Sequence, residues 1–527
     1  MLKKLHVKHY KAFDEAAINL RPITILLGAN SVGKSSIIQL FLMLQQTGRA
    51  GLKSYKSALK LYGGYINLGD PLNLFRKKNQ STPLSFSFQI ESTTIKNALK
   101  TDFINSFTRL FFELPMFMPL KGFSDLKEKP IETREDFSKY LDSVIAVLAK
   151  STTKDNFRRE IRYFLRQRNP FPISIVSKEN KGELLQLYDF LNELSKKIKN
   201  DSFSVSYSLI LNGSNNLEVS KFEIKHQELL ILSLSLHEEF ILSSDLINLN
   251  HNNVELVREA FQSSNTIFSS FTEANSLEKL EGAPIANFVV QIFSLFQTEL
   301  QKNFSENNIN YVSPLRAHPK RYYMLDKAKV NLTLDTLDGD AITEVLKDNK
   351  QVTKKVNVWL KNFGVEVDVQ GFKEVIHHLV VKQNNIDLDI TDVGFGISQI
   401  LPVIIQGFLS SDSSMTIIEQ PEIHLHPKMQ ADLADLFIDI VHNSKNKKLI
   451  IETHSEYLLK RLRRRISEGK IHPSEVSICL FSPQTKSAGA KIETLEIQDK
   501  GFFDWPEDFY GGEIMKDTTE FIKNQNA

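Results

Sequence analysis

A glycine-rich stretch near the start of the chain, residues 28–36, has the spacing of a phosphate-binding loop, G-x-x-x-x-G-K-[ST]. The apolar residues 23–27 before it predict a buried strand, and residues 37–44 after it predict a helix. A turn in this position points backbone N–H groups at phosphate oxygens, and the helix N-terminus adds partial positive charge. The sequence therefore predicts a nucleoside triphosphate site formed by Gly28, Asn30, Ser31, Gly33, Lys34, Ser35 and Ser36.

The chemistry of this loop assigns a task to two of its side chains. Lys34 is predicted to reach the β- and γ-phosphates, and the Ser35 hydroxyl is predicted to bind Mg²⁺. A second apolar run, residues 415–419, ends in the carboxylate of Glu419, which suits the acidic position that holds Mg²⁺ or its water. Glutamate and histidine side chains follow within residues 420–427, and a metal site formed by them alone is the alternative interpretation.

A further apolar run, residues 448–451, leads into Glu452-Thr453-His454-Ser455. A histidine at a strand end beside a nucleotide can hydrogen-bond the γ-phosphate or the attacking water, so His454 is a candidate catalytic residue. A purely structural histidine is the alternative.

Small residues precede a predicted helix at residues 400–409 and suggest a second anion-binding helix end. In the alternative interpretation this segment is a loop in which Ser398 or Asp392 caps the helix. Because the two helix ends are far apart in sequence, the second is predicted to contact a nucleotide held by another copy. The residues concerned are Gly394, Gly396 and Ser398.

Composition limits the class of protein. The 527 residues carry a net charge of +2, with 41% hydrophobic and 24% charged residues, which is typical of a globular protein with more than one structural unit. The single cysteine, Cys479, excludes an internal disulfide and favours a reducing, cytoplasmic location. We expect no secretory signal and no membrane partner, because no run reaches the roughly 20 apolar residues of a membrane span.

Predicted elements change along the chain. Residues 5–10 and 16–20 predict a hairpin before the phosphate loop, and residues 85–91 predict a strand. Helical patterns follow at residues 101–114, 133–149, 156–168 and 182–199, and strands are predicted near the end at residues 476–482 and 492–497.

Residues 28–36, 394–399, 417–427 and 452–455 together resemble the ATPase heads of the ABC/SMC class, in particular its RecF- and OLD-like branch. The resemblance implies an α/β fold, an ABC/SMC-type P-loop NTPase head with a large, mainly helical insertion. The implied parts are an N-terminal head segment at 1–75, the helical insertion at 76–305, a C-terminal head segment at 306–475, and a strand with an aromatic tail at 476–527.

Residues 314–316, 419–427 and 501–506 further resemble a subgroup of bacterial AAA family ATPases. Related stand-alone ATPases occur in anti-phage modules such as Septu and some retrons, where the partner is an HNH nuclease or another effector. OLD proteins carry a Toprim nuclease domain after the histidine. The tail here shows no paired-acid Toprim pattern, so we expect any nuclease to be a partner.

The resemblance also implies a mechanism with ATP and Mg²⁺. Two heads would form a homodimer or higher oligomer around ATP, with the Gly394 loop of one chain completing the γ-phosphate site of the other. Ser35 and Glu419 would hold Mg²⁺, and His454 would sense the γ-phosphate. Arg316 would either contact charge or form an ordinary salt bridge, and residues 68–70 are the candidate region for a further Mg²⁺ ligand.

One position departs from the pattern, because Gln420 stands where a glutamate usually orients the attacking water. An amide holds water but does not accept its proton, and loss of a general base costs on the order of 10² to 10⁴ in rate. We therefore expect slow hydrolysis, or that Glu422 or His424 supplies the missing function.

A basic run follows His454 and contains Lys460, Arg461, Arg463, Arg464 and Arg465. It predicts either a solvated helix face or an edge that binds DNA phosphates or a partner. The segment around Trp505 predicts either a docking edge or a buried aromatic closure.

Three functions are compatible with the sequence. The first is a regulatory ATPase whose nucleotide state controls an effector in anti-phage defence. The second is a RecF-like repair ATPase that acts on DNA, with DNA or RNA as a possible ligand. The third is a scaffold that binds ATP with little turnover.

Overall fold

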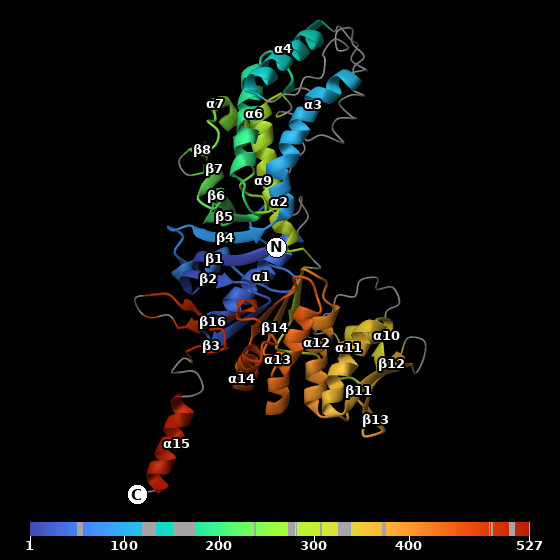
Figure 1. Ribbon diagram of the computed structural model, residues 1–527. Coiled ribbons are helices and arrows are strands. Elements are labelled where there is room, and N and C mark those ends of the chain that lie inside the picture. The colour runs from blue at the N-terminus through green and yellow to red at the C-terminus, as the bar shows by residue number, and fades with distance from the viewer. Residues whose placement is uncertain are drawn as a thin grey trace. The chain divides into compact units, whose positions relative to one another are not determined.

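The computed structural model gives the arrangement of the helices and strands (Figure 1). It describes residues 1–49, 56–117, 133–150, 175–236, 239–271, 280, 282–305, 308–324, 339–371, 376–483, 485, 488–504 and 512–525. The helix expected at residues 156–168 and the segment around Trp505 lie outside these ranges.

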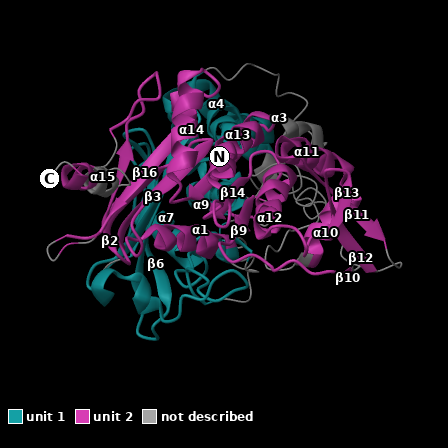
Figure 2. Cartoon of the chain, turned by 90° about the horizontal axis from the view of Figure 1, so that it is seen from below, with its two compact units in different colours: residues 1–3, 46–302 teal, residues 4–45, 303–527 magenta. Residues whose placement is uncertain are grey.

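The chain divides into two compact units (Figure 2). Unit 1 comprises residues 1–3 and 46–302, and unit 2 comprises residues 4–45 and 303–527. The first strand, β1 (Leu2–Tyr10), begins in unit 1 and continues in unit 2. The four parts expected from the sequence remain predictions.

The main sheet of unit 2 contains the strand that precedes the phosphate loop. Its strand order is β17-β16-β3-β15-β14-β9, with parallel pairing from β16 to β9 and an antiparallel β17 at the edge. Every residue of β3 is buried, as is typical of a central parallel strand covered on both faces. The strands are β3 (Ile23–Gly28), β9 (Ile309–Val312), β14 (Met415–Glu419), β15 (Lys448–Glu452), β16 (Val476–Ser482) and β17 (Lys491–Leu495).

Helices follow three of these parallel strands. Helix α1 comes after β3, α13 after β14 and α14 after β15, so the three connecting loops lie at the same carboxyl edge of the sheet. Apolar residues of α12, α13 and α14 join those of β3, β14 and β15 in one core cluster. The helices are α1 (Lys34–Gly48), α12 (Phe395–Leu409), α13 (Pro427–His442) and α14 (Glu456–Ser467).

A smaller subdomain of unit 2 joins a sheet to two helices. Its strands lie in the order β10-β12-β11, with β13 pairing with β12. Trp359 of α11 and Val381 of β12 belong to the same core cluster as the main sheet. The elements are β10 (Tyr323–Met324), α10 (Gly339–Asp348), α11 (Lys350–Leu360), η5 (Lys361–Phe363), β11 (Val365–Gly371), β12 (Ile376–Gln383) and β13 (Ile386–Asp389).

The remaining elements of unit 2 lie near the two ends of the chain. Strand β1 pairs antiparallel with β2 (Phe13–Asn19), as the sequence predicted. The short helix η6 (Pro473–Glu475) precedes β16. Helix α15 (Gly512–Gln525) follows the last strand and was not predicted from the sequence.

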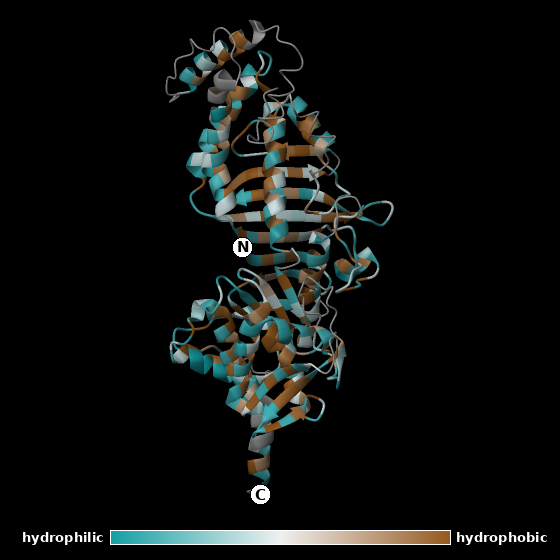
Figure 3. Cartoon of the chain, turned by 90° about the vertical axis from the view of Figure 1, so that its right-hand side faces the viewer, coloured by the Kyte–Doolittle hydropathy of each residue, from teal (hydrophilic) through white to brown (hydrophobic). Residues whose placement is uncertain are grey.

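Unit 1 combines helices with an antiparallel sheet, so the expected mainly helical insertion also contains an extended β region. Strands β4 to β8 pair in sequence order, and β5 alternates buried with partly exposed residues because its apolar and polar side chains alternate (Figure 3). The strands are β4 (Leu84–Glu91), β5 (Ser202–Leu211), β6 (Leu217–His226), β7 (Leu229–Leu236) and β8 (Phe240–Ser243).

The helices of unit 1 pack largely through aromatic side chains. Phe288 of α9 contacts Phe103 and Phe190 edge to face, at ring distances of 4.9 and 5.6 Å. The helical segments are η1 (Pro71–Leu74), η2 (Arg76–Lys78), α2 (Thr93–Asn97), the π-helical η3 (Ala98–Asp102), α3 (Phe103–Phe117), α4 (Arg134–Lys150), α6 (Lys181–Lys197), α7 (His251–Ala260) and α9 (Pro284–Lys302). Among the described residues of the whole chain, no helix is long and apolar enough to cross a membrane.

Candidate functional site

The predicted phosphate loop connects β3 to α1. Its first residue, Gly28, has φ +141°, and a Cβ there would lie 2.5 Å from the backbone oxygen of Phe481 in β16. Only glycine therefore fits where the loop leaves the sheet. Asn30, Ser31 and Ser35 are exposed, so their polar groups are accessible to a ligand. Helix α1 begins as the backbone N–H groups of Ser36 and Ile37 donate to Gly33 O.

Lys34 is the buried charge of this loop. It is 3% exposed, and its Nζ donates to the carbonyl oxygens of Gly28 and Ala29 at 2.9 and 2.8 Å. The same Nζ lies 3.5 Å from Glu452 Oε1. Burial lowers the pKa of Lys34, and the charge of Glu452 acts in the opposite direction. The lysine thus connects the loop to the neighbouring strand β15.

Two carboxylates lie side by side at the carboxyl edge of the sheet. Glu419 ends β14, Glu452 ends β15, and the two are register partners. Tyr311 of β9 donates its hydroxyl to Glu419 Oε1 at 2.5 Å. Burial raises the pKa of Glu419 to about 7, the Tyr311 hydrogen bond lowers it, and the negative charge of Glu452 raises it further. The edge thus places two carboxyl groups beside Lys34.

Glu422 holds the segment that carries His454. Its Oε2 accepts a hydrogen bond from Thr453 Oγ1 at 2.8 Å, and its Oε1 accepts one from the backbone N–H of His454 at 2.7 Å. Burial raises the pKa of Glu422. Helix α14 then begins at Glu456, and the hydroxyl of its N-cap residue Ser455 accepts from Leu458 N. Glu422 therefore links the segment after β14 to the segment after β15 by hydrogen bonds.

The His454 side chain is half-buried, and within the part of the chain that the structure describes its Nε2 atom has no hydrogen-bond partner. Burial lowers its pKa, and the positive charge of Lys34 lowers it further, so both effects favour the neutral imidazole. A neutral ring presents one nitrogen as donor or acceptor to a ligand.

Arg316 holds the backbone next to Glu419. It is 7% exposed and donates to the carbonyl oxygens of Glu419, Gln420 and Gln399 at 2.8, 3.1 and 3.3 Å. Burial lowers its pKa to about 10. Arg316 is thus buried against backbone oxygens, and an exposed salt bridge is not what holds it.

Gln420 itself adopts a strained backbone. Its φ is +45°, which is uncommon for a residue with a side chain, and its N–H donates to the backbone oxygen of Glu452 at 2.8 Å. Arg316 and this hydrogen bond stabilise the turn from two directions.

The second helix end predicted from the sequence begins α12. Gly394 is its N-cap, and no described side chain forms a capping hydrogen bond there. Ser398 Oγ donates to Phe395 O, and Asp392 pairs with Arg321, so the prediction that Ser398 or Asp392 caps α12 is wrong.

Gly396, in the first turn of α12, packs closely on the segment after β14. A Cβ at this position would lie 2.9 Å from His424 O, because the two backbones approach closely. Phe395 and His424 also meet edge to face, with ring centroids 4.9 Å apart. The α12 turn therefore rests on the residues that follow Glu419, and the His424 ring packs against an aromatic side chain.

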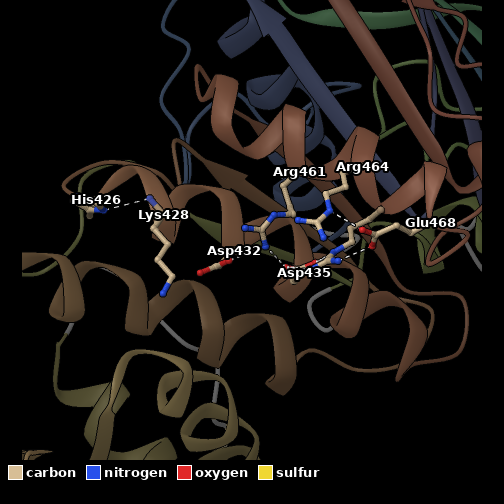
Figure 4. A network of polar contacts seen from close by, with 8 residues as sticks. His426, Lys428, Asp432, Asp435, Arg461, Arg464 and Glu468 are labelled. Atoms are coloured by element: carbon tan, nitrogen blue, oxygen red, sulfur yellow. Dashed lines mark hydrogen bonds and ion pairs between the residues drawn. The ribbon is translucent and has the colours of Figure 1, made fainter.

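Most basic residues of α14 pair with acidic side chains, and Figure 4 shows the pairs that Arg461 and Arg464 form. Arg461 pairs with Asp432 and Asp435 of α13 at 2.8 and 2.6 Å, and Arg465 pairs with Asp435 and Glu468. Lys460 pairs with Glu456 and Arg464 with Glu468. Arg463 donates to Gly501 O and lies against the Phe503 ring. These contacts join α13 to α14 and account for the run structurally.

Other sequence predictions concern metal ligands. Within the described ranges, no group of three or more His, Cys, Asp or Glu side chains is arranged to hold a metal ion, and the alternative metal site near His424 gains no support. His426 caps α13 instead, with Pro427 at the first helical position (Figure 4). Asp70, in the candidate region of unit 1, accepts a hydrogen bond from Leu72 N and caps η1.

In unit 2 the structure brings together Lys34, Glu419, Glu422 and His454 from the predicted set. It adds Glu452 and Tyr311, which the sequence did not single out. Glu452 ends an apolar run, as Glu419 does, and this was the signal in the sequence that could have singled it out. The signal does not show that Glu452 lies beside Glu419 or that it pairs with Lys34.

The strand order β3-β15-β14 places one strand between the phosphate-loop strand and the acidic strand. This arrangement defines an α/β P-loop ATPase fold, as the sequence predicted. A family model described as AAA ATPase domain matches residues 1–459, and the chain belongs to that family.

Solved structures similar to this chain include three SMC heads. The SMC head domain from Thermotoga maritima has a TM-score of 0.35 and 9% identity, covering 94% of this chain and 99% of that chain. The SmcHead bound to the C-winged helix domain of ScpA has a TM-score of 0.36 and 10% identity, with 94% and 98% covered. The Smc head domain with an extended coiled coil bound to the C-terminal domain of ScpA, derived from Pyrococcus furiosus, has a TM-score of 0.31 and 10% identity. The match covers 100% of this chain and 99% of that chain. No curated protein matches the chain.

Proposed function

We propose that this protein binds ATP with Mg²⁺, hydrolyses it slowly, and through its nucleotide state regulates a partner effector in prokaryotic anti-phage defence. The observation that carries the ATPase part is the position of Lys34, which contacts the phosphate-loop carbonyls and Glu452 next to Glu419. Membership of the AAA ATPase domain family agrees with it.

The residues of this edge fit a triphosphate and a divalent cation. Exposed loop residues offer donors to phosphate oxygens, and Lys34 offers a positive charge. Ser35 and Glu419 would hold Mg²⁺, which would neutralise phosphate charge when bound. Glu452 Oε2 and His454 Nε2 are buried and have no hydrogen-bond partner in the described ranges, so both can bind such a ligand.

Slow turnover is proposed from the chemistry of residue 420. Its amide orients water without taking a proton, and Glu422 has hydrogen bonds on both carboxylate oxygens. His454 is proposed to contact the γ-phosphate or the attacking water through Nε2.

We further propose that two chains dimerise around ATP in the cytoplasm. The uncapped helix end at Gly394, together with Gly396 and Ser398, would contact the γ-phosphate held by the other chain. The effector is proposed to be a nuclease of the HNH type or another toxin. The paired charges of α14 give no support to a DNA-binding edge there.

The test compares the wild type with Lys34→Ala for binding of a fluorescent ATP analogue, phosphate release and mass in solution with and without ATP and Mg²⁺. We expect Lys34→Ala to weaken binding at least about tenfold to a hundredfold, since a charge-assisted phosphate contact is lost. We expect ATP to double the mass in solution of the wild type but not that of Lys34→Ala. An equal affinity in both proteins would contradict the proposal.

The matched control is Lys460→Ala, which removes an exposed lysine of α14 that pairs with Glu456 one helical turn earlier. We expect it to bind ATP like the wild type. Co-purification with a nuclease whose activity changes with ATP would support the effector part, and an ATPase stimulated by DNA alone would favour the RecF-like alternative.

A further inference from the structure

Three carboxylates lie at the carboxyl edge beside Lys34, and they differ in what their oxygens contact. Glu419 accepts the Tyr311 hydroxyl, and Glu422 accepts hydrogen bonds on both oxygens. Glu452 faces Lys34 through Oε1, while its Oε2 is buried and has no hydrogen-bond partner among the described residues. The residue is 5% exposed. An unpartnered carboxylate oxygen in such a place is costly unless a ligand or a reaction uses it.

The fold places Glu452 next to the position where a carboxylate is missing. Strand β15 lies between β3 and β14, so Glu452 ends the strand between the phosphate loop and Glu419. The backbone oxygen of Glu452 accepts the N–H of Gln420 at 2.8 Å. Glu452 therefore places a carboxylate at the end of the strand next to β14, and its backbone is hydrogen-bonded to the backbone of Gln420.

We propose that Glu452 is the general base of ATP hydrolysis in this protein, a role that rests on the proposed function above. The water oxygen forms a bond to the γ-phosphorus, the bond from that phosphorus to the leaving ADP oxygen breaks, and the water proton passes to the Glu452 carboxylate. Release of the proton to solvent restores the carboxylate, and the products are ADP and phosphate.

Lys34 has a second part in this inference. It pairs with Glu452 and with two loop carbonyls. When the triphosphate binds, the Lys34 side chain moves so that its ammonium group contacts the phosphates. Glu452 then loses its counter-ion and is available as a base. The paired state also accounts for slow turnover, because each cycle must separate a buried ion pair.

The alternative is that Glu452 only neutralises Lys34, and Glu452→Gln separates the two. The variant keeps the side-chain size and removes the proton acceptor. We expect kcat to fall by on the order of 10² to 10⁴, while affinity for a fluorescent ATP analogue stays equal or becomes tighter. Nucleotide extracted from the variant after incubation with ATP and Mg²⁺ should be ATP, whereas that from the wild type should be largely ADP.

A second substitution restores a carboxylate from the neighbouring position. We expect Gln420→Glu to recover turnover in the Glu452→Gln protein, and to raise turnover less than about tenfold in the wild type, which already has a base. The single variant Gln420→Glu leaves the buried Lys34 pair intact, so it tests the inference even if Glu452→Gln fails to fold. Glu493→Gln, an exposed position of β17, is the matched control for loss of charge.

Two results would overturn the inference. The first is a Glu452→Gln protein that turns over ATP within about twofold of the wild type, and the second is a rise of 10² or more for Gln420→Glu alone. Both require a wild type that hydrolyses ATP. A wild type that neither binds nor hydrolyses ATP contradicts the proposed function itself, so the two failures are distinguishable.

Discussion

The Glu422 carboxylate accepts the backbone N–H of His454 at 2.7 Å and so ties the turn after β14 to the turn after β15. The contact joins residues that are 32 positions apart in sequence. It fixes where His454 leaves the sheet without involving its imidazole, so the ring remains available for a ligand. Glu422 therefore acts on the candidate site through the backbone.

Removing the Glu422 carboxylate should first of all lower the stability of the folded protein. Glu422→Ala leaves Thr453 Oγ1 and His454 N without an acceptor, and we expect the free energy of unfolding to fall by about 2–4 kcal/mol. Urea denaturation of the nucleotide-free protein measures it. Turnover should fall as well and should not be recovered by adding Gln420→Glu. An unchanged denaturation midpoint would contradict this role.

Arg316 should behave as a structural cation. Arg316→Met leaves the carbonyls of Glu419, Gln420 and Gln399 without this donor, and we expect a loss of about 2–4 kcal/mol in the free energy of unfolding. Arg321→Met, at an exposed arginine paired with Asp392, is the control and should change stability by less than about 1 kcal/mol. Equal denaturation midpoints for the two variants would show that Arg316 holds nothing of consequence.

We expect the ion pairs between α13 and α14 to stabilise the fold and to make no contribution to DNA binding. A double-mutant cycle of Asp435→Asn and Arg465→Met should give about 1 kcal/mol of coupling, decreasing with added salt because the pair is partly exposed. Replacing Arg463, Arg464 and Arg465 together by alanine should lower stability and leave DNA binding unchanged. Weaker DNA binding with a smaller salt dependence would instead favour the DNA-binding interpretation of this run.

Glu419 should make stability depend on pH. Its pKa is raised from 4.5 to about 7, so between these values the folded protein binds more protons than the unfolded chain, and stability falls as pH rises. Glu419→Gln removes this loss and can still accept the Tyr311 hydroxyl. We expect its melting temperature to exceed that of the wild type more at pH 8 than at pH 4.5. A difference that does not vary with pH would refute the assignment, and Glu493→Gln is the exposed control.

Local sequence predicted the parts of the site that a single segment determines. The phosphate loop, the strands ending at Glu419 and Glu452, and the position of His454 follow from apolar runs and small residues within a few positions of each other. The P-loop fold was predicted from the resemblance of these segments to the ATPase heads of the ABC/SMC class. The antiparallel sheet of unit 1 was underestimated, although β5 alternates apolar and polar residues as clearly as β4, because helical patterns separate these two strands in the sequence.

Contacts between distant segments were the part that the sequence did not reveal. Tyr311 meets Glu419 across 108 positions, and Arg316 meets the backbone of Glu419 across 103. A hydrogen bond from an arginine to a carbonyl has no complementary side chain to mark it in the sequence. The pairing of Lys34 with Glu452 depends in the same way on the register of β3 and β15, which only the folded sheet defines.

The central position of β3 has a consequence for biosynthesis. Ile25 pairs with Ile451 and with Ile478, so this buried strand has its partners only when most of the chain has been translated. At about 5–20 residues per second, roughly 20 to 90 s separate the appearance of Ile25 from that of Ile451 on the ribosome. During that interval the apolar strand lacks its neighbours. We therefore expect the nascent chain to depend on chaperones, and incomplete translation products to aggregate.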